Sequence, residues 1–177
     1  KKSSMNSRFS KILIIIFFLF CFFIFLKGLD KTDNYQPKGN IGKKISTFSA
    51  QKLSDSQVIY SDEFLKNKKF YLINIWSSWC VPCRTEHSKL MTLSKNSELK
   101  IIGLNYRDKN INALKFLKEL GNPYHEILTD KDGTVAISLG AFGVPETFLL
   151  NNKKIILKKY IGPLTDHSLK EINLILE

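Results

Sequence analysis

Cysteine and histidine are both scarce in this sequence, which contains three of each among its 177 residues. A structural zinc site needs four such ligands, usually supplied as closely spaced pairs. Cys80 and Cys83 form one pair, but the other candidates, His87, His125 and His167, belong to no second pair. We therefore expect no metal site, and we expect the cysteine pair to act without a cofactor.

Acidic residues are also few, with 16 Asp and Glu against 27 Lys and Arg, which gives a formal net charge of +11. The excess lies near the N-terminus, because residues 1–44 contain nine Lys or Arg and only two Asp or Glu. A nucleic-acid-binding protein more often spreads basic residues along a groove, with exposed aromatic residues between them. No such pattern occurs after residue 45, so the sequence argues against nucleic acid as a partner.

Long hydrophobic runs are limited to one, the fifteen residues from Ile12 to Leu26, which Lys11 and Lys27 flank. Cleavage of a signal peptide needs small residues in an A-x-A-like arrangement, and residues 25–33 offer a single glycine. We predict an uncleaved signal anchor over residues 12–29, whose flanking lysines extend toward the headgroups. A cleaved signal peptide is the alternative.

The rest of the chain divides at the end of this anchor. Residues 30–41 are polar and rich in turn formers, which predicts a linker. From about Gly42 onward, short apolar runs alternate with amphipathic stretches, a pattern typical of an α/β domain. We expect this domain to occupy residues 42–177.

The first half of the domain predicts a β-α-β-α order. Residues 70–76 are aromatic and branched throughout, as in a strand buried on both faces. Residues 81–95 fit a surface helix with one apolar stripe, and residues 99–104 a second buried strand. Asn110 is a candidate cap for a helix that reaches Leu120.

The second half predicts a hairpin and a final helix. Residues 126–129 are a candidate short strand, and residues 147–150 and 155–160 form two antiparallel strands joined by the four residues between them. Thr165 or Asp166 is expected to cap the last helix. The predicted order of the main elements is β-α-β-α-β-β-α.

Cys80 is expected at the N-terminus of a helix, because the preceding strand ends at Trp76. Unpaired N–H groups and the helix dipole favour an anion there, so they stabilise a thiolate, the species that attacks disulfides. Cys83 lies on the same helix face, within reach for a bridge, and Pro82 is tolerated in the first turn. We predict an exposed attacking thiol at Cys80 and a shielded resolving thiol at Cys83.

A purely structural disulfide is one alternative, although it would close too short a loop to stabilise the fold much. Two reduced cysteines in the core of a cytosolic protein are another, although the export segment indicates a compartment in which thiols oxidise. His87 is interpreted as a surface residue of the helix. Trp79 is expected to cover the disulfide, whereas Trp76 could equally belong to the core.

The combination of an aromatic strand, Trp-Cys-x-x-Cys and a later Val-Pro before a hydrophobic strand resembles the thioredoxin superfamily. The segments "NIWSSWCVPCRTEH", "LKELGNPY" and "GAFGVPETFLL" more narrowly resemble the membrane-anchored thioredoxin-like proteins of cytochrome c maturation, known as CcmG or DsbE. The resemblance extends from about Gly42 to the C-terminus and implies a thioredoxin-like fold, with helices flanking a central mixed β-sheet. Ser46 and Thr47 stand where the family usually has a proline.

This resemblance implies a thiol:disulfide oxidoreductase that keeps the haem-attachment cysteines of apocytochrome c reduced. A single-pass anchor in the bacterial inner membrane would leave residues 1–11 in the cytoplasm and the catalytic domain in the periplasm. The implied partners are apocytochrome c or another thiol protein of haem maturation, and a membrane electron donor of the DsbD or CcdA kind.

The resemblance also implies a substrate groove beside the cysteines. Its residues are Trp79, Pro82, Glu86, Val144, Pro145 and Glu146. Pro145 matches the superfamily's cis-proline, which would turn the backbone at Val144 toward Cys80 to pair with an extended substrate. Carboxylates at Glu86 and Glu146 would disfavour the thiolate and make the pair more reducing. The alternative is that both are solvated surface acids.

Two further functions remain open at this stage. A broader periplasmic disulfide reductase or isomerase would use the same cysteines on many substrates. A copper-binding metallochaperone would bind the metal through the cysteine pair together with His125 or His167.

Overall fold

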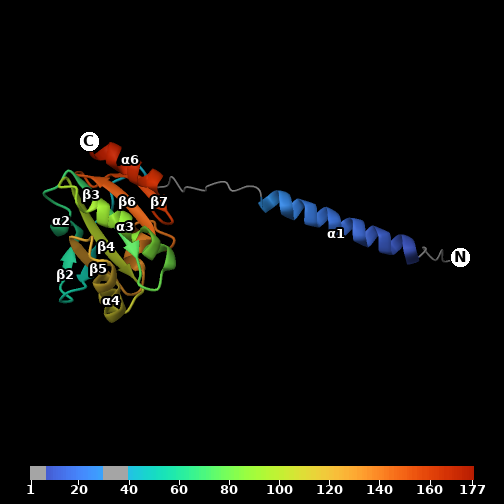
Figure 1. The fold of residues 1–177 in the computed structure, drawn as a ribbon, viewed down its shortest axis with the longest axis horizontal. Coiled ribbons are helices and arrows are strands. Elements are labelled where there is room, and N and C mark those ends of the chain that lie inside the picture. Colours follow the sequence, from blue (N-terminus) through green and yellow to red (C-terminus); the bar gives the residue numbers. More distant parts are fainter. Residues whose placement is uncertain (1–6, 30–39) are drawn as a thin grey trace. The chain divides into compact units, whose positions relative to one another are not determined.

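A computed structural model of the chain describes residues 7–29 and 40–177 (Figure 1). The chain separates into two compact units, one up to Gln36 and one from Pro37 onward. Most of the predicted linker, and residues 1–6 of the predicted cytoplasmic segment, lie outside the described residues. The boundaries of the linker and of the N-terminal segment therefore stay predictions.

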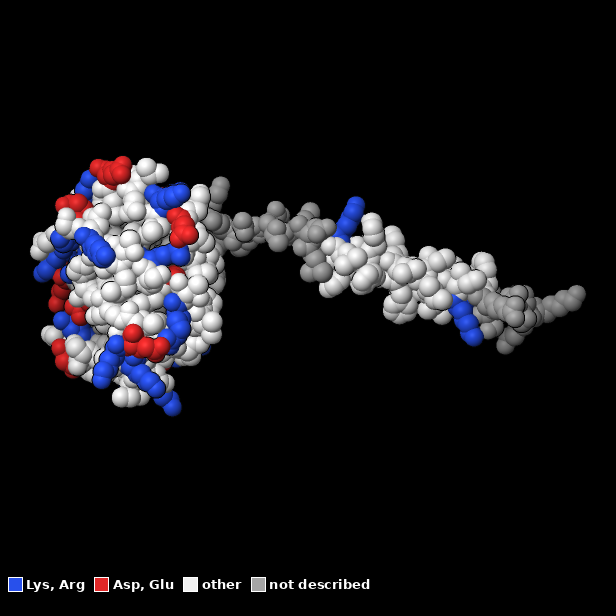
Figure 2. All heavy atoms as spheres, in the orientation of Figure 1, with Lys and Arg blue, Asp and Glu red and all other residues white. Residues whose placement is uncertain are grey.

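Residues 7–29, the described part of the N-terminal unit, form the helix α1 (Ser7–Leu29). Within it, Phe9–Lys27 is long and apolar enough to cross a membrane. Figure 2 shows α1 free of acidic and basic side chains over most of its length. The helix begins five residues before the predicted start of the anchor and ends where the prediction placed its end.

The second unit is built on a seven-stranded sheet with the order β2-β1-β5-β4-β3-β6-β7. Its strands are β1 (Ser49–Lys52), β2 (Val58–Tyr60), β3 (Phe70–Trp76), β4 (Leu99–Tyr106), β5 (Glu126–Asp130), β6 (Glu146–Asn151) and β7 (Ile156–Ile161). The three strands β3, β4 and β5 are parallel, and all other neighbours are antiparallel. The predicted mixed sheet and its C-terminal hairpin are confirmed.

Helices cover both faces of this sheet (Figure 1). They are α2 (Ser61–Phe64), α3 (Val81–Leu93), α4 (Asn110–Leu120), α5 (Thr134–Ser138) and α6 (Asp166–Leu176). Buried residues of α3, α4 and α6 share one hydrophobic cluster, whereas those of α2 and α5 belong to the other. The helices α3 and α4 share a face because both connect parallel strands that are added in the same direction along the sheet, and such crossovers have one hand.

All seven residues of β3 are buried, as the sequence predicted. Because side chains alternate along a strand, Phe70, Leu72 and Trp76 contribute to the cluster with α3, α4 and α6. Ile73 and Ile75 contribute to the opposite cluster. The strand is thus anchored from both sides, which fixes the position of the loop that follows it.

Several expected details are wrong. Lys109, not Asn110, is the N-cap of α4, and its side chain makes no capping hydrogen bond. The helix expected to extend to residue 95 ends at Leu93. The predicted order omits the hairpin of β1 and β2, which extends the sheet beyond β5.

We predict that Gly103→Ala in β4 destabilises the fold. A Cβ atom at this position would lie 2.8 Å from the ring of Tyr124 and 2.9 Å from Nε1 of Trp76. Overpacking of this kind costs about 1–3 kcal/mol, so the denaturation midpoint should fall. Gly143→Ala is the control, because a Cβ there meets nothing within 4 Å; equal losses in both variants would contradict the packing argument.

Candidate redox site

The cysteine pair lies where the chain leaves β3 and enters α3. Cys80 is the N-cap of α3, with φ −85° and ψ 108°, and Pro82 lies in the first turn. The backbone N–H of Cys83 donates to Sγ of Cys80 at 3.1 Å. This first-turn donor points at the sulfur that would carry a negative charge, so the predicted thiolate site has its expected geometry.

Cys80 and Cys83 are joined by a disulfide, with their Cα atoms 5.3 Å apart. Only 4% of Cys80 and 2% of Cys83 are exposed, and both belong to the hydrophobic cluster of α3. The prediction that Cys80 is exposed is therefore wrong for the disulfide form. Packing of the bridge against the core shields both sulfurs.

Two residues adjacent to the cysteines in the sequence are exposed. Trp79 and Pro82 are exposed, and the indole Nε1 of Trp79 donates to the backbone oxygen of Arg107 at 3.1 Å. Trp76, by contrast, is a core residue stacked on Tyr124.

The loop before β6 approaches the same cluster. The Val144–Pro145 peptide bond is cis, as the resemblance implied. Pro145 is buried, whereas Val144 is half-buried and packs against the cluster that contains both cysteines. Val144 thus packs against the same cluster as the cysteines, and the pairing of its backbone with a substrate stays a prediction.

Glu86 is fully buried in α3, three residues after Cys83. Its Oε1 accepts a hydrogen bond from Asn74 Nδ2 at 2.8 Å, and its Oε2 accepts one from the backbone N–H of Leu164 at 2.8 Å. Burial raises the pKa of Glu86 to about 7, because these two hydrogen bonds and the more distant Lys89 only partly offset the loss of solvent. Glu86 thus changes its charge near neutral pH.

Asn74 connects Glu86 to two other buried groups. Its Nδ2 also donates to Thr147 Oγ1 at 3.0 Å, and its Oδ1 accepts from the hydroxyl of Tyr124 at 2.8 Å. Burial, and to a smaller extent the Glu86 charge, raise the pKa of Tyr124, so its hydroxyl keeps its proton. The sequence prediction missed this network, although Asn74 is the one polar residue in an otherwise apolar strand.

Glu146 is buried as well and organises the loop before β6. Its Oε1 accepts from the backbone N–H groups of Phe142 and Gly143, at 2.6 and 3.0 Å. Its Oε2 lies 2.8 Å from Nζ of Lys159, an ion pair that is not aligned as a hydrogen bond. The alternative that Glu86 and Glu146 are solvated surface acids is therefore wrong.

His87 is also buried, so its interpretation as a surface residue is wrong. Its Nε2 lies 3.0 Å from the backbone oxygen of Gly121, and its ring packs edge-on against Phe116. Burial lowers the pKa of His87, which favours the neutral ring. Because the backbone oxygen of Gly121 can only accept a hydrogen bond, Nε2–H is the donor. His87 therefore serves the contact between α3 and the end of α4.

Metal-binding residues do not converge in the described parts of the chain. No group of three or more His, Cys, Asp or Glu residues in residues 7–29 and 40–177 could hold a metal ion. His125 accepts a hydrogen bond from the backbone N–H of Ile101 through Nδ1 at 3.1 Å. The structure thus offers the copper hypothesis no support.

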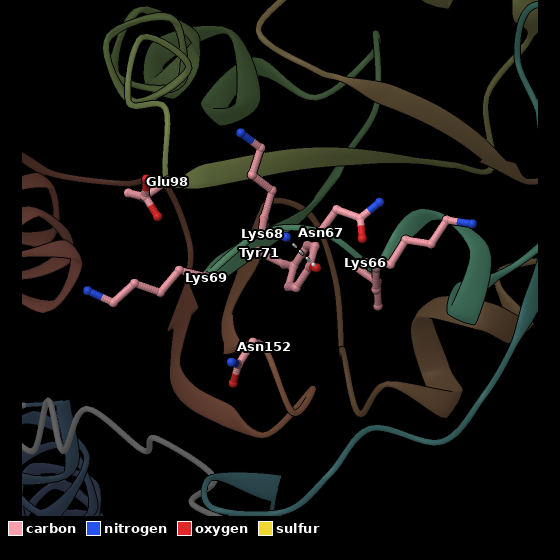
Figure 3. Close-up of a pocket in the computed structure, with 8 residues that line it drawn as sticks. Lys66, Asn67, Lys68, Lys69, Tyr71, Glu98 and Asn152 are labelled. Atoms are coloured by element: carbon pink, nitrogen blue, oxygen red, sulfur yellow. Dashed lines mark hydrogen bonds between the residues drawn. The ribbon is translucent and has the colours of Figure 1, made fainter.

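A cavity of about 590 Å³ lies at the other end of β3 and contains neither cysteine. Figure 3 shows Lys66, Lys68 and Lys69 at its rim, with their side chains pointing in different directions. The cavity lies where β3 begins, whereas the cysteines follow the end of the strand. It is therefore separate from the redox site.

Glu86 should make the stability of the protein depend on pH. Its pKa is about 7 in the folded chain against 4.5 for an ordinary Glu, so its stabilising contribution is complete below about pH 4.5 and is lost as the pH rises through about 7. The loss amounts to about 3 kcal/mol. Between pH 5 and pH 8, the free energy of unfolding of the oxidised wild-type protein should fall by roughly this amount relative to that of Glu86→Gln. If the two proteins show parallel profiles of unfolding free energy against pH, the raised pKa of Glu86 is contradicted.

Comparison with known proteins agrees with this site. The Redoxin family matches residues 40–175. The thiol:disulfide interchange protein CycY of Rhizobium leguminosarum bv. viciae is 48% identical over 103 residues, which are 58% of this chain and 55% of CycY. The thiol:disulfide interchange protein DsbE of Yersinia pestis is 34% identical over 168 residues, which are 91% of this chain and 89% of that protein.

The fold is shared with solved structures. A DsbF homologue from Corynebacterium diphtheriae superposes with a TM-score of 0.64 at 22% sequence identity, over 80% of this chain and 88% of that one. This likeness confirms the thioredoxin-like fold. Because the Redoxin match covers most of the chain and the DsbE match nearly all of it, the chain belongs to the Redoxin family, as one of its DsbE-type thiol:disulfide oxidoreductases.

Proposed function

We propose that this oxidoreductase keeps the haem-attachment cysteines of apocytochrome c reduced during c-type cytochrome maturation. The observation that supports a reducing role is the burial of Glu86 three residues from Cys83. The similarity to DsbE and CycY over the same residues supports the pathway.

The exchange begins with the reduced protein. The Cys80 thiolate attacks one sulfur of the substrate disulfide, and the other substrate sulfur leaves as a thiolate that takes up a proton. Cys83 then loses its proton and attacks Cys80 in the mixed disulfide, which releases the second substrate thiol. Two electrons have passed to the substrate, and the product is the Cys80–Cys83 bridge present in the structure. A membrane electron donor of the DsbD or CcdA kind would reduce this bridge again.

The proposed location is the outer face of a bacterial inner membrane. The apolar helix α1 would cross the membrane once, with residues 1–11 in the cytoplasm and residues 30–41 as the linker to the catalytic domain. A periplasmic catalytic domain fits the chemistry, because substrate disulfides form in oxidising compartments.

The substrate is proposed to bind over the surface beside the buried bridge. Trp79 and Pro82 would contact it from the side of α3, and the backbone of Val144 and Pro145 would pair with it as an extended strand. Glu146 would support this contact indirectly, because it holds the backbone N–H groups of Phe142 and Gly143.

The reduction potential tests whether the site is reducing. A charged Glu86 disfavours a thiolate at the nearby cysteines and so makes the reduced form less stable. We expect a potential near the approximately −270 mV of thioredoxin. Glu86→Gln should raise it by about 30 mV at pH 8, which corresponds to about 1.4 kcal/mol, and leave it nearly unchanged at pH 6, where Glu86 is itself protonated.

Glu119→Gln is the matched control for this measurement. Glu119 is exposed and pairs with Arg84 of α3 at 2.7 Å, so solvent screens its charge. Its removal should leave the potential unchanged at both pH values. A wild-type potential near the approximately −120 mV of strong oxidants would contradict a reducing function.

Trapping identifies the substrate. Cys83→Ser leaves Cys80 free to attack but removes the thiol that resolves the mixed disulfide, so substrates should stay bound to Cys80. We expect apocytochrome c or another thiol protein of haem maturation as the main trapped partner, identified by mass spectrometry after non-reducing gels. Cys80→Ala with Cys83→Ser is the control and should trap nothing. Many unrelated partners would favour a broader reductase or isomerase.

A further inference from the structure

The loop that carries the chain into α3 is held by a second loop, the one between β4 and α4. Asp108 of that second loop accepts four hydrogen bonds. Its Oδ2 accepts from Ser78 N–H at 2.6 Å and from Asn105 Nδ2 at 3.0 Å, and its Oδ1 accepts from the Ser78 hydroxyl and from Lys109 N–H, each at 2.8 Å. One carboxylate thus binds both the backbone and the side chain of Ser78.

The residue before Asp108 adds a third contact between the loops. The backbone oxygen of Arg107 accepts the indole N–H of Trp79 at 3.1 Å. Arg107 itself is fixed from the opposite side, because its N–H donates to the oxygen of Asp130 at 2.9 Å and its guanidinium donates twice to the oxygen of Asp132. Its φ of +44° lies in the left-handed region, which non-glycine residues adopt only when surrounding contacts determine it.

Asp108 acts as a charged acceptor. Its partial burial raises the pKa, but hydrogen bonds from Ser78, Asn105 and Lys109 outweigh this effect and hold the pKa below its usual range. Hydrogen bonds to an ionised acceptor are roughly twice as strong as those between neutral groups. The two hydrogen bonds that Asp108 accepts from Ser78 are therefore stronger than hydrogen bonds between neutral groups of two loops.

Ser78 is two residues from Cys80, and the N–H of Cys80 donates to the oxygen of Ser77 at 3.2 Å. The direction in which residues 77–79 approach α3 therefore determines how Cys80 is presented to the first-turn N–H of Cys83. We propose that Asp108 is a positioning residue for thiol–disulfide exchange: through Ser78 it fixes the attacking sulfur of Cys80 and the indole of Trp79. It touches neither the substrate nor the reacting atoms.

Asp108→Asn tests this role. Each carboxylate oxygen accepts two hydrogen bonds, so an amide NH₂ in place of either oxygen would face a donor and release at least one of them. We expect the reduced full-length variant in detergent to react about tenfold more slowly with a small aromatic disulfide. In the same protein, the Trp79 indole N–H signal should shift and lose protection against hydrogen exchange. The buried indole of Trp76, the other tryptophan, serves as the internal reference.

Asp132→Asn is the matched control. Asp132 Oδ1 accepts from the N–H and the hydroxyl of Thr134, at 3.0 and 2.8 Å, an arrangement like that of Asp108 with Ser78. Arg107 contacts only the backbone oxygen of Asp132, so that contact remains in the variant. This variant is expected to lose some stability but to keep the wild-type rate and the wild-type Trp79 signal.

Ser78→Ala provides a milder second test, because it removes the hydroxyl donor and leaves the N–H. We expect a two- to threefold lower rate, and the effects of Ser78→Ala and Asp108→Asn should be non-additive in the double variant, since both act on one contact. If Asp108→Asn does not fold, the reaction rate and the Trp79 signal of Ser78→Ala test the proposal by themselves. Wild-type rates with an unmoved Trp79 signal, whatever the change in melting temperature, would reduce Asp108 to a structural residue and overturn the proposal.

Discussion

The hydrogen bond from the Cys83 N–H to Sγ of Cys80 is the contact on which this molecule's chemistry depends. It exists only if the chain enters α3 at a fixed point and in a fixed direction. The entry point is fixed by β3, which is buried on both faces and paired with β4 and β6 on either side. The direction is fixed by residues 77–79, which are held against the loop between β4 and α4. The N-terminus of α3 thus acts as a redox site because β3 and the loop between β4 and α4, both outside the helix, hold it in place.

Features with a strong local cause were predictable from the sequence. The apolar composition of residues 70–76 identified a strand buried on both faces, and the position of Cys80 after that strand identified the N-terminus of a helix. Thr165 caps α6 through a hydrogen bond from Ser168 N–H, a contact between residues three positions apart. Such interactions are determined within a few residues, so a sequence pattern is sufficient to indicate them.

The hydrogen-bond partners of the polar residues around the site were not predictable in the same way. Glu86 and His87 lie on the buried stripe of α3 that also contains Cys83, Leu90 and Leu93. Their partners, however, are the backbone of Leu164 and of Gly121, 78 and 34 residues away. Glu146 is buried beside Lys159 on the neighbouring strand. Contacts between distant segments decide which partners these side chains have. Asn74 was a further local signal, because a lone amide in a buried strand requires partners.

The hydrogen bonds around Glu86 constrain where a proton can be placed. The N–H of Leu164 belongs to the backbone and cannot become an acceptor, so a proton on Oε2 would face another donor. A proton on Oε1 is accommodated only when the Asn74 amide turns over and presents its oxygen. The Tyr124 hydroxyl must then reverse from donor to acceptor. Neutralising this one carboxylate therefore changes the hydrogen-bonding roles of two further side chains, Asn74 and Tyr124.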